Sequence, residues 1–160
     1  MLQHAATYEA SYLQKRLIDG AQGPIDDLKI PHAVFSRPEI AGVGATEQEL
    51  KDAGTPYVAV FGNWAASARA RSARVDYQRT KLLVSSADYS ILGCHFIGPE
   101  ASTMLHQILM LIHLNNDVRE LTTTVYIHPA LNEVVLAAAR LSSLPRGCPR
   151  CREVGRGEGC

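Results

Sequence analysis

The sequence has no excess of either charge, because 16 Lys and Arg residues balance 16 Asp and Glu residues. A dedicated nucleic-acid binder usually carries a basic excess, so this balance argues against that class of protein. No apolar run approaches the roughly 18 residues that a membrane-spanning helix needs. We therefore expect neither a nucleic-acid partner nor a membrane partner.

Cysteine is also scarce, with four residues in 160. This number does not make a disulfide scaffold, and the first residues lack the basic start and apolar block of a secretory signal. We therefore expect a cytoplasmic location. The two common phosphate-cradling motifs, G-x-G-x-x-G and G-x-x-x-x-G-K-[ST], do not occur either, so the chain alone has no nucleotide-binding fingerprint.

The composition is otherwise that of an ordinary globular protein, 46% hydrophobic and 20% charged. The chain of 160 residues is long enough to bury a core. Hydrophobic periodicity and turn residues predict strands over 32–36, 40–45, 57–63, 77–86 and 90–98, the last two joined as a hairpin. The same signals predict helices over 3–18, 46–54, 99–116, 117–124 and 130–141. This order predicts an α+β fold, an antiparallel sheet of about four to five strands covered by helices.

Several residues mark the expected helix starts. Thr46 with Glu49 has the spacing of a capping box. Pro99 is expected in the first turn of the long helix, and Asp117 is expected to cap the helix that follows. Pro129 is expected as the first residue of the last helix.

The arginines and histidines outside these positions can be interpreted as structural or as functional residues. "ARARSAR" (68–74) is either a phosphate or nucleic-acid patch or a solvated turn or short helix, and the neutral charge balance favours the second. We expect structural roles for the four histidines His32, His95, His106 and His113.

The stretch "TVYIHPALNEVV" (124–135) carries the strongest chemical signal. Pro129 disfavours a helical conformation at His128, which places this imidazole in front of a helix. Glu133 can reach back to it, and a carboxylate on one ring nitrogen leaves the other nitrogen for proton transfer. The residues alone leave two readings open, a helix-end histidine and a catalytic acid/base pair.

Three stretches, "IPHAVFSRPEIAGVGATEQEL", "ILGCHFIGPEAS" and "IHPALNEVV", together resemble the C-terminal dimerisation domain of the pyridine nucleotide-disulfide oxidoreductases. This family contains flavoenzymes such as dihydrolipoamide dehydrogenase, mycothione reductase and mercuric reductase. The similarity runs from residue 1 to about residue 142. It implies a homodimer that uses FAD and NAD(P) and acts on a disulfide or dithiol substrate.

The resemblance also implies roles for individual residues. His128 corresponds to the active-site acid/base, which serves the partner subunit, and Glu133 corresponds to its orienting carboxylate. The opening Met1, Leu2, Gln3 and His4 resembles the segment that passes the flavin ring, and Pro129 is a further candidate for contact with the cofactor. The implied division is a remnant of the FAD-binding domain over 1–22, a dimerisation domain over 23–142 and a disordered tail over 143–160.

The chain departs from the family pattern in two respects. The redox pair C-x-x-x-x-C does not occur, and the FAD and nicotinamide domains are missing, so we expect a fragment that is inactive alone. The tail instead carries Cys148 and Cys151 as C-x-x-C, which is open to three readings: a redox pair, half of a metal site or a non-functional extension. The alternative function is a non-catalytic dimerisation or interaction module that retains only the fold.

Overall fold

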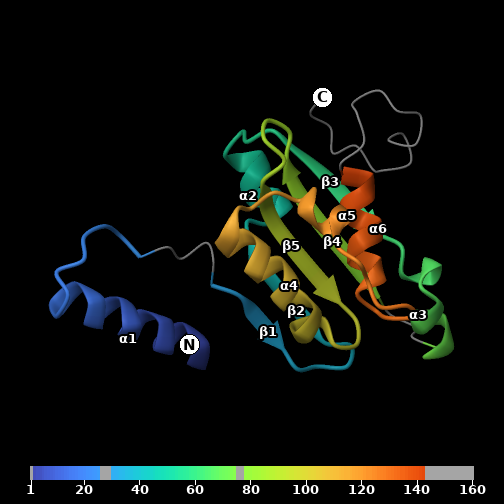
Figure 1. Cartoon of the computed structure of the whole chain (residues 1–160), viewed down its shortest axis with the longest axis horizontal. Coiled ribbons are helices and arrows are strands. Elements are labelled where there is room, and N and C mark those ends of the chain that lie inside the picture. Colours follow the sequence, from blue (N-terminus) through green and yellow to red (C-terminus); the bar gives the residue numbers. More distant parts are fainter. Residues whose placement is uncertain (1, 26–29, 75–77, 143–160) are drawn as a thin grey trace.

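One open antiparallel sheet forms the centre of the protein, in a computed structural model that describes residues 2–25, 30–74 and 78–142 (Figure 1). The strand order is β1-β2-β5-β4-β3, and every neighbouring pair is antiparallel. The strands are β1 (His32–Val34), β2 (Ile40–Gly44), β3 (Tyr57–Gly62), β4 (Arg79–Ser85) and β5 (Ile91–Ile97). The predicted α+β class, strand number and hairpin are therefore confirmed.

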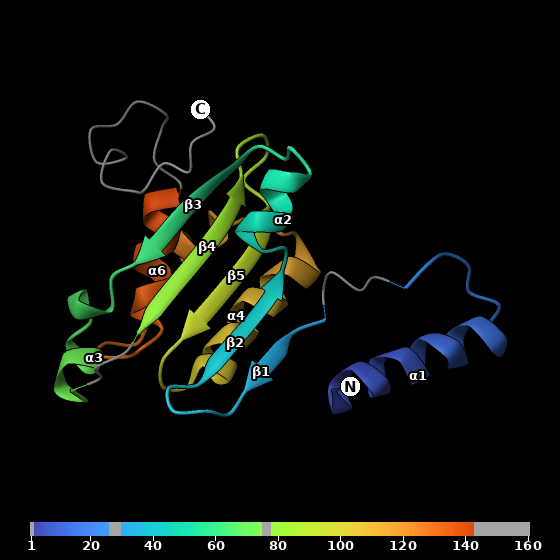
Figure 2. The ribbon, with the colours of Figure 1, turned by 180° about the vertical axis from the view of Figure 1, so that it is seen from behind.

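Helices cover the two faces of this sheet unequally. The larger layer lies on one face and the short helix α2 on the other (Figures 1 and 2). The larger layer consists of α4 (Ala101–Leu114), α5 (Glu120–Thr123) and α6 (Glu133–Ser142), and α2 spans Glu47–Asp52. Within the described residues, no helix is long and apolar enough to cross a membrane.

The main core fills the space between the sheet and the larger helical layer. Alternate strand residues such as Val43, Leu82 and Phe96 point into it and are almost fully buried. The predicted stripe on α4 supplies buried Met104, Leu105 and Ile108, with partly buried Leu109 and Ile112 beside them. Of the face predicted for the last helix, Val134, Val135 and Ala138 lie in α6, and buried Leu131 lies in the turn before it. The opposite face of the sheet has a smaller cluster under α2, formed by Leu50, Ala59 and Leu83.

The N-terminal helix α1 (Gln3–Leu17) lies beside the sheet and not over it (Figures 1 and 2). None of its residues is buried. The predicted bounds for this helix, 3–18, differ from the observed ones by one residue. The division of the chain into 1–22 and 23–142 stays a prediction.

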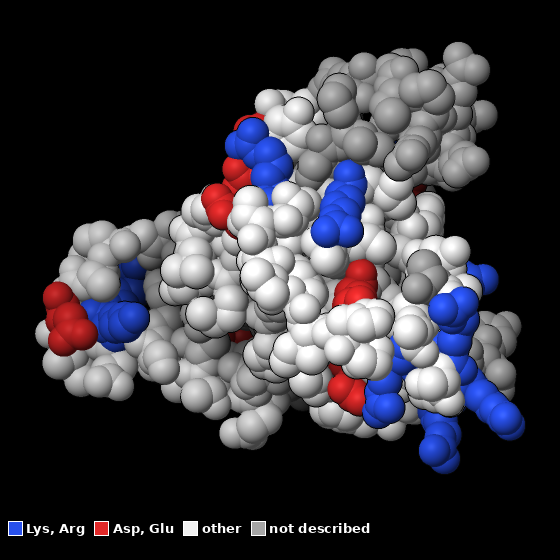
Figure 3. Space-filling view, turned by 45° about the vertical axis from the view of Figure 1, so that its right-hand side comes forward, with Lys and Arg blue, Asp and Glu red and all other residues white. Residues whose placement is uncertain are grey.

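Local signals located some helix starts correctly. The capping box of α2 forms as predicted: the Glu49 backbone N–H donates to Thr46 Oγ1 at 3.2 Å, and the Thr46 backbone N–H donates to Glu49 Oε2 at 2.7 Å. Residues 68–74 contain the short helix α3 (Ala68–Ser72), which Ser67 caps. Arg69, Arg71 and Arg74 are exposed, and Figure 3 shows basic side chains projecting into solvent at this end of the molecule.

Two other predicted starts are wrong. The helix α4 begins at Ala101, so Pro99 lies outside its first turn, because Glu100 adopts a left-handed φ of 58° that interrupts the helix. The helix α5 begins at Glu120, not after Asp117, and Asp117 does not cap it. The Asp117 carboxylate instead accepts hydrogen bonds from the backbone N–H and the guanidinium of Arg119, which holds residues 117–119 in a separate turn.

One buried polar contact ties the β3–β4 connection to the sheet. The indole Nε1–H of Trp64 donates to Thr80 Oγ1 at 2.7 Å, and both side chains are at most 2% exposed. Trp64 also packs against Gly98, where an added Cβ would lie 2.8 Å from the indole ring. The indole therefore joins the start of β4 to the end of β5.

We predict that Thr80→Val destabilises the protein by about 1–3 kcal/mol, because valine keeps the shape but leaves the buried indole N–H without an acceptor. Urea unfolding followed by Trp64 fluorescence measures the change. Thr80→Ser is the matched control, since it retains the hydroxyl and should cost less. Equal losses for the two variants would contradict a role for the hydrogen bond.

Candidate functional site

The connection between α5 and α6 carries the candidate acid/base pair. Residues 125–127 leave α5 in an irregular conformation, and α6 begins only at Glu133. In the first turn of α6, the Val134 and Val135 N–H groups donate to the carbonyl oxygens of Leu131 and Asn132, three residues earlier. This turn places Glu133 at the first position of α6, with its side chain directed back along the chain.

The carboxylate of Glu133 makes two contacts in that direction. His128 Nδ1 lies 2.8 Å from Oε1, and the Ala130 backbone N–H donates to Oε2 at 2.9 Å. The His128 side chain is 70% exposed and that of Glu133 is 24% exposed. The structure therefore brings together the two residues that the sequence paired, and it holds the carboxylate through a backbone contact as well as through the imidazole.

These contacts have an electrostatic consequence. The hydrogen bond from His128 and, to a smaller extent, the one from the Ala130 N–H hold the pKa of the Glu133 carboxyl below its ordinary value. Glu133 is therefore a carboxylate at neutral pH. A carboxylate on Nδ1 orients the ring and directs the other nitrogen, Nε2, outward, where it can accept or donate a proton.

The prediction that Pro129 is the first residue of the last helix is wrong. The His128–Pro129 peptide is cis, and Pro129 lies in a bend four residues before α6 begins. The Ala130 N–H donates to the Glu133 side chain, a contact of the kind that caps a helix start, so the chain at Pro129 precedes the helix. His128 consequently stands outside the helix.

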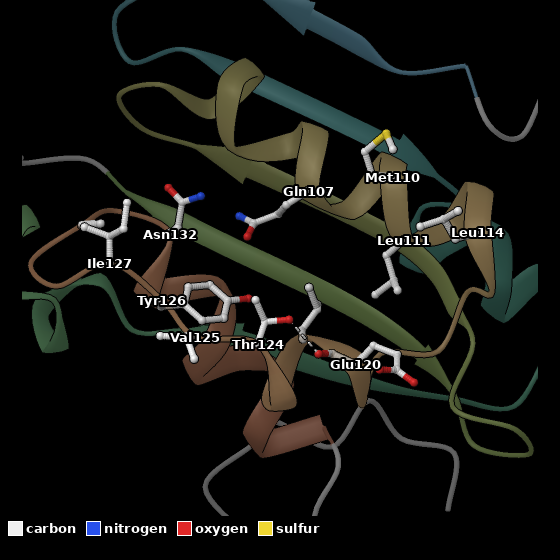
Figure 4. Close-up of a pocket in the computed structure, with 12 residues that line it drawn as sticks. Gln107, Met110, Leu111, Leu114, Glu120, Thr124, Val125, Tyr126, Ile127 and Asn132 are labelled. Carbon is white, nitrogen blue, oxygen red and sulfur yellow. Dashed lines mark hydrogen bonds between the residues drawn. The ribbon is translucent and has the colours of Figure 1, made fainter.

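An apolar groove lies next to this pair. It has a volume of about 500 Å³ and runs between α4 and the segment 124–127 (Figure 4). Met110 and Leu114 line one side, and Val125 and Ile127 line the other. These four side chains are 59%, 73%, 95% and 82% exposed, respectively. The sequence analysis did not identify this surface, although the apolar residues that directly precede His128 were a signal for it.

The predicted flavin-contacting residues lie at a different place. Met1 is outside the described residues. Leu2 precedes α1, Gln3 is its first residue, and His4 Nε2 lies 2.6 Å from the Pro31 carbonyl oxygen. His4 borders a second cavity, of about 570 Å³, together with Tyr8, Met110 and His113. The described contacts therefore group these residues with the start of β1 and with α4, and not with His128.

The cysteines are distributed between the core and the tail. Cys94 in β5 is fully buried, and this burial raises the pKa of its thiol far above the ordinary value. A thiol of this kind does not supply a thiolate nucleophile. Cys148 and Cys151, the predicted C-x-x-C, lie outside the described residues.

Comparison with known proteins identifies a family and several relatives. Residues 30–139 match the model of the family described as pyridine nucleotide-disulphide oxidoreductase, dimerisation domain. Dihydrolipoyl dehydrogenase of Geobacillus stearothermophilus is 34% identical over 141 residues, and that of Bacillus subtilis is 33% identical over 141 residues. Each match covers 88% of this chain but only 30% of the relative. The chain thus spans about a third of the length of these curated relatives.

Solved structures share the fold. LpdA from Mycobacterium tuberculosis superposes with a TM-score of 0.80 at 22% identity, over 87% of this chain and 30% of LpdA. The HOCl-induced flavoprotein disulfide reductase RclA from Escherichia coli superposes with a TM-score of 0.78 at 21% identity, over 88% of this chain and 33% of RclA. The sheet and its helical layer therefore recur as one part of larger proteins.

We predict that His128→Ala raises the pKa of the Glu133 carboxyl, because the substitution removes the strongest contact that lowers it. The Ala130 N–H remains, so the pKa should stay below its ordinary value. Carboxyl ¹³C NMR across a pH titration measures both effects.

The sign of the pH dependence follows from the lowered pKa. The His128–Glu133 contact contributes stability above the carboxyl pKa of the unfolded chain, and that contribution is lost as the pH falls through the folded value. His106→Ala, at an exposed histidine on α4, is the control and should leave the Glu133 titration unchanged. An unchanged titration in His128→Ala would contradict the pairing.

Proposed function

The chain belongs to the pyridine nucleotide-disulphide oxidoreductase family, through its dimerisation domain, and from this membership we propose that it supplies the acid/base pair of a flavin-dependent NAD(P)H–disulfide oxidoreductase. His128 is the proton donor and acceptor, and Glu133 orients it. The pair serves the dithiol–disulfide centre of the partner subunit. The isolated chain is inactive, because the flavin and the redox cysteines belong to other parts of the enzyme.

The observation that carries this proposal is the 2.8 Å contact between His128 Nδ1 and Glu133 Oε1 on an otherwise exposed imidazole. With the carboxylate on Nδ1, the neutral ring carries its proton there and presents a lone pair at Nε2. When Nε2 takes a proton from a thiol, the carboxylate stabilises the imidazolium that forms. Returning that proton to a departing thiolate completes the cycle, so one side chain serves both directions of thiol–disulfide exchange.

A helix cap alone would not need this arrangement. The backbone donor at Ala130 already occupies Glu133 Oε2, so the capping contact is complete without the histidine. The second oxygen is directed to His128, whose exposed ring buries little apolar surface. Because one carboxylate oxygen contacts the backbone and the other contacts His128, the arrangement supports acid/base chemistry over a purely structural role.

The apolar groove supports a homodimer. Related enzymes use this domain for dimerisation, and the groove exposes four large apolar side chains that water solvates poorly. A second copy is the occupant we propose. In an isologous interface, the same patch serves both subunits, so the segment 125–127 of each chain would lie at the interface and direct the adjacent His128 toward the other subunit.

The N-terminal residues fit one edge of an FAD site. The start of α1 has no side-chain cap, so its first backbone N–H groups are available to acceptor oxygens of a bound ring system. FAD, when bound, would accept and pass on the electrons of the reaction. We propose that Met1 to His4 border the flavin and that Pro129 approaches it from the dimerisation domain, with 1–22 belonging to the FAD-binding domain and 23–142 to the dimerisation domain.

We predict that His128→Ala slows disulfide exchange about 100-fold in an assembled enzyme, the effect expected for loss of a general acid/base. A suitable enzyme is a chimera in which residues 23–142 replace the matching domain of the Geobacillus dihydrolipoyl dehydrogenase. Turnover with lipoamide measures the effect, and flavin absorbance reports on assembly.

The control variant in the same chimera is Glu133→Gln, which keeps a hydrogen-bond acceptor but removes its charge. Its pH–rate profile should move to lower pH because the imidazolium loses its counter-charge. An active His128→Ala chimera with an unshifted Glu133→Gln profile would favour the alternative function, a non-catalytic dimerisation module.

We predict that the chain forms a dimer at micromolar concentration and that Ile127→Asp converts it to a monomer, because the substitution places a charge in the apolar groove. Sedimentation velocity measures the change. Leu17→Asp is the matched control: Leu17 is 79% exposed on α1 and does not line the groove. A monomeric starting protein would contradict the proposed interface, and so would equal effects of the two variants.

A further inference from the structure

A second cluster of chemically active side chains lies on the opposite face of the sheet, the face that carries α2. Strand pairing aligns one position from each strand in a continuous row. In sheet order, the row is His32, Gly42, His95, Lys81 and Phe61. Across the strands, only Gly42 lies between His32 and His95, although the two histidines are 63 positions apart in the sequence.

The missing side chain at Gly42 lets the two rings approach one another. A Cβ added there would lie 2.6 Å from His95 Nδ1 and 2.9 Å from His32 Nε2. The ring centroids are 6.3 Å apart with an interplanar angle of 38°. One nitrogen of each imidazole is thus turned toward the same space above Gly42.

The tautomer of His95 is set by its other nitrogen. His95 Nε2 lies 3.1 Å from the Ala45 carbonyl oxygen, which can only accept, so Nε2 carries the hydrogen. The neutral ring then presents a lone pair at Nδ1, the atom that faces Gly42 and His32. A backbone carbonyl that orients one imidazole nitrogen is the outer-shell arrangement of metal-binding histidines.

We propose that His32 Nε2 and His95 Nδ1 form a two-histidine site for a borderline divalent metal ion such as zinc(II). Imidazole suits zinc, nickel and copper ions, and a zinc–nitrogen bond is about 2.0–2.1 Å long. His32 is exposed on the edge strand β1, so its ring can rotate toward His95 as the ion binds. Neither histidine is used by the proposed acid/base chemistry.

The surrounding charges are compatible with a cation. Lys81, the next residue in the row, forms an ion pair with Glu47 and lies over the Phe61 ring at 5.4 Å from its centroid, so its charge is already partnered. Lys81 and Glu49 both lie close enough to His95 to act on it electrostatically, with opposite signs. In the part of the chain that the structure describes, no group of three His, Cys, Asp or Glu side chains is arranged to hold an ion, so water would complete the coordination shell.

The test is a zinc(II) titration followed by ¹⁵N NMR of the imidazole nitrogens, in a chain with Cys148→Ser, Cys151→Ser and Cys160→Ser so that thiolates do not compete. We expect His32 Nε2 and His95 Nδ1 to shift together with one affinity. His32→Ala should weaken zinc binding at His95 at least about tenfold, as loss of a ligand should exceed loss of an outer-shell contact.

Two controls make the result decisive. His106→Ala removes an exposed histidine on α4 and should leave both shifts unchanged. His95→Asn should abolish the response of His32, and a melting curve checks that this variant folds. The proposal is overturned if zinc leaves the His32 and His95 signals in place, or if His95 responds equally well in the His32→Ala chain.

Discussion

The burial of α4 and α6 side by side on one face of the sheet is the constraint on which the other features depend. The helix α4 packs on β2 and β5, whereas α6 packs on β3 and β4, so the chain must pass from one half of the sheet to the other between them. Residues 115–132 make this crossing and include the short helix α5. Val118, Leu121 and Leu131 on this crossing are buried in the core, whereas Val125 and Ile127 remain exposed. His128 stands near the end of the crossing, before α6 begins at Glu133.

Sequence patterns were sufficient wherever the determining contacts are local. The capping box at Thr46 depends on residues three apart, and the pairing of His128 with Glu133 depends on residues five apart. Hydrophobic periodicity likewise identified the strands and the buried faces of α4 and α6, because each buried face repeats within its own element.

The errors at Pro99 and Asp117 occurred where a contact outside the local pattern determines the backbone. At Pro99, the neighbouring Gly98 packs against the Trp64 ring and Glu100 turns left-handed, so α4 starts late. At Asp117, an isolated β-bridge to Ser90, the residue before β5, holds the backbone outside the helix. The row that joins His32 to His95 was equally inaccessible, since it depends on the register of three strands and no local spacing encodes it.

The burial of Cys94 also has a kinetic meaning. Its sulfur lies in the central strand β5 and is fully inaccessible to solvent, so a thiol-modifying reagent can react with it only after β5 separates from the helical layer. The rate of labelling at this position would therefore count openings of the sheet centre, in the same way that amide exchange counts openings of single hydrogen bonds. Labelling of Cys94 would thus report the opening motions of the domain from its central strand.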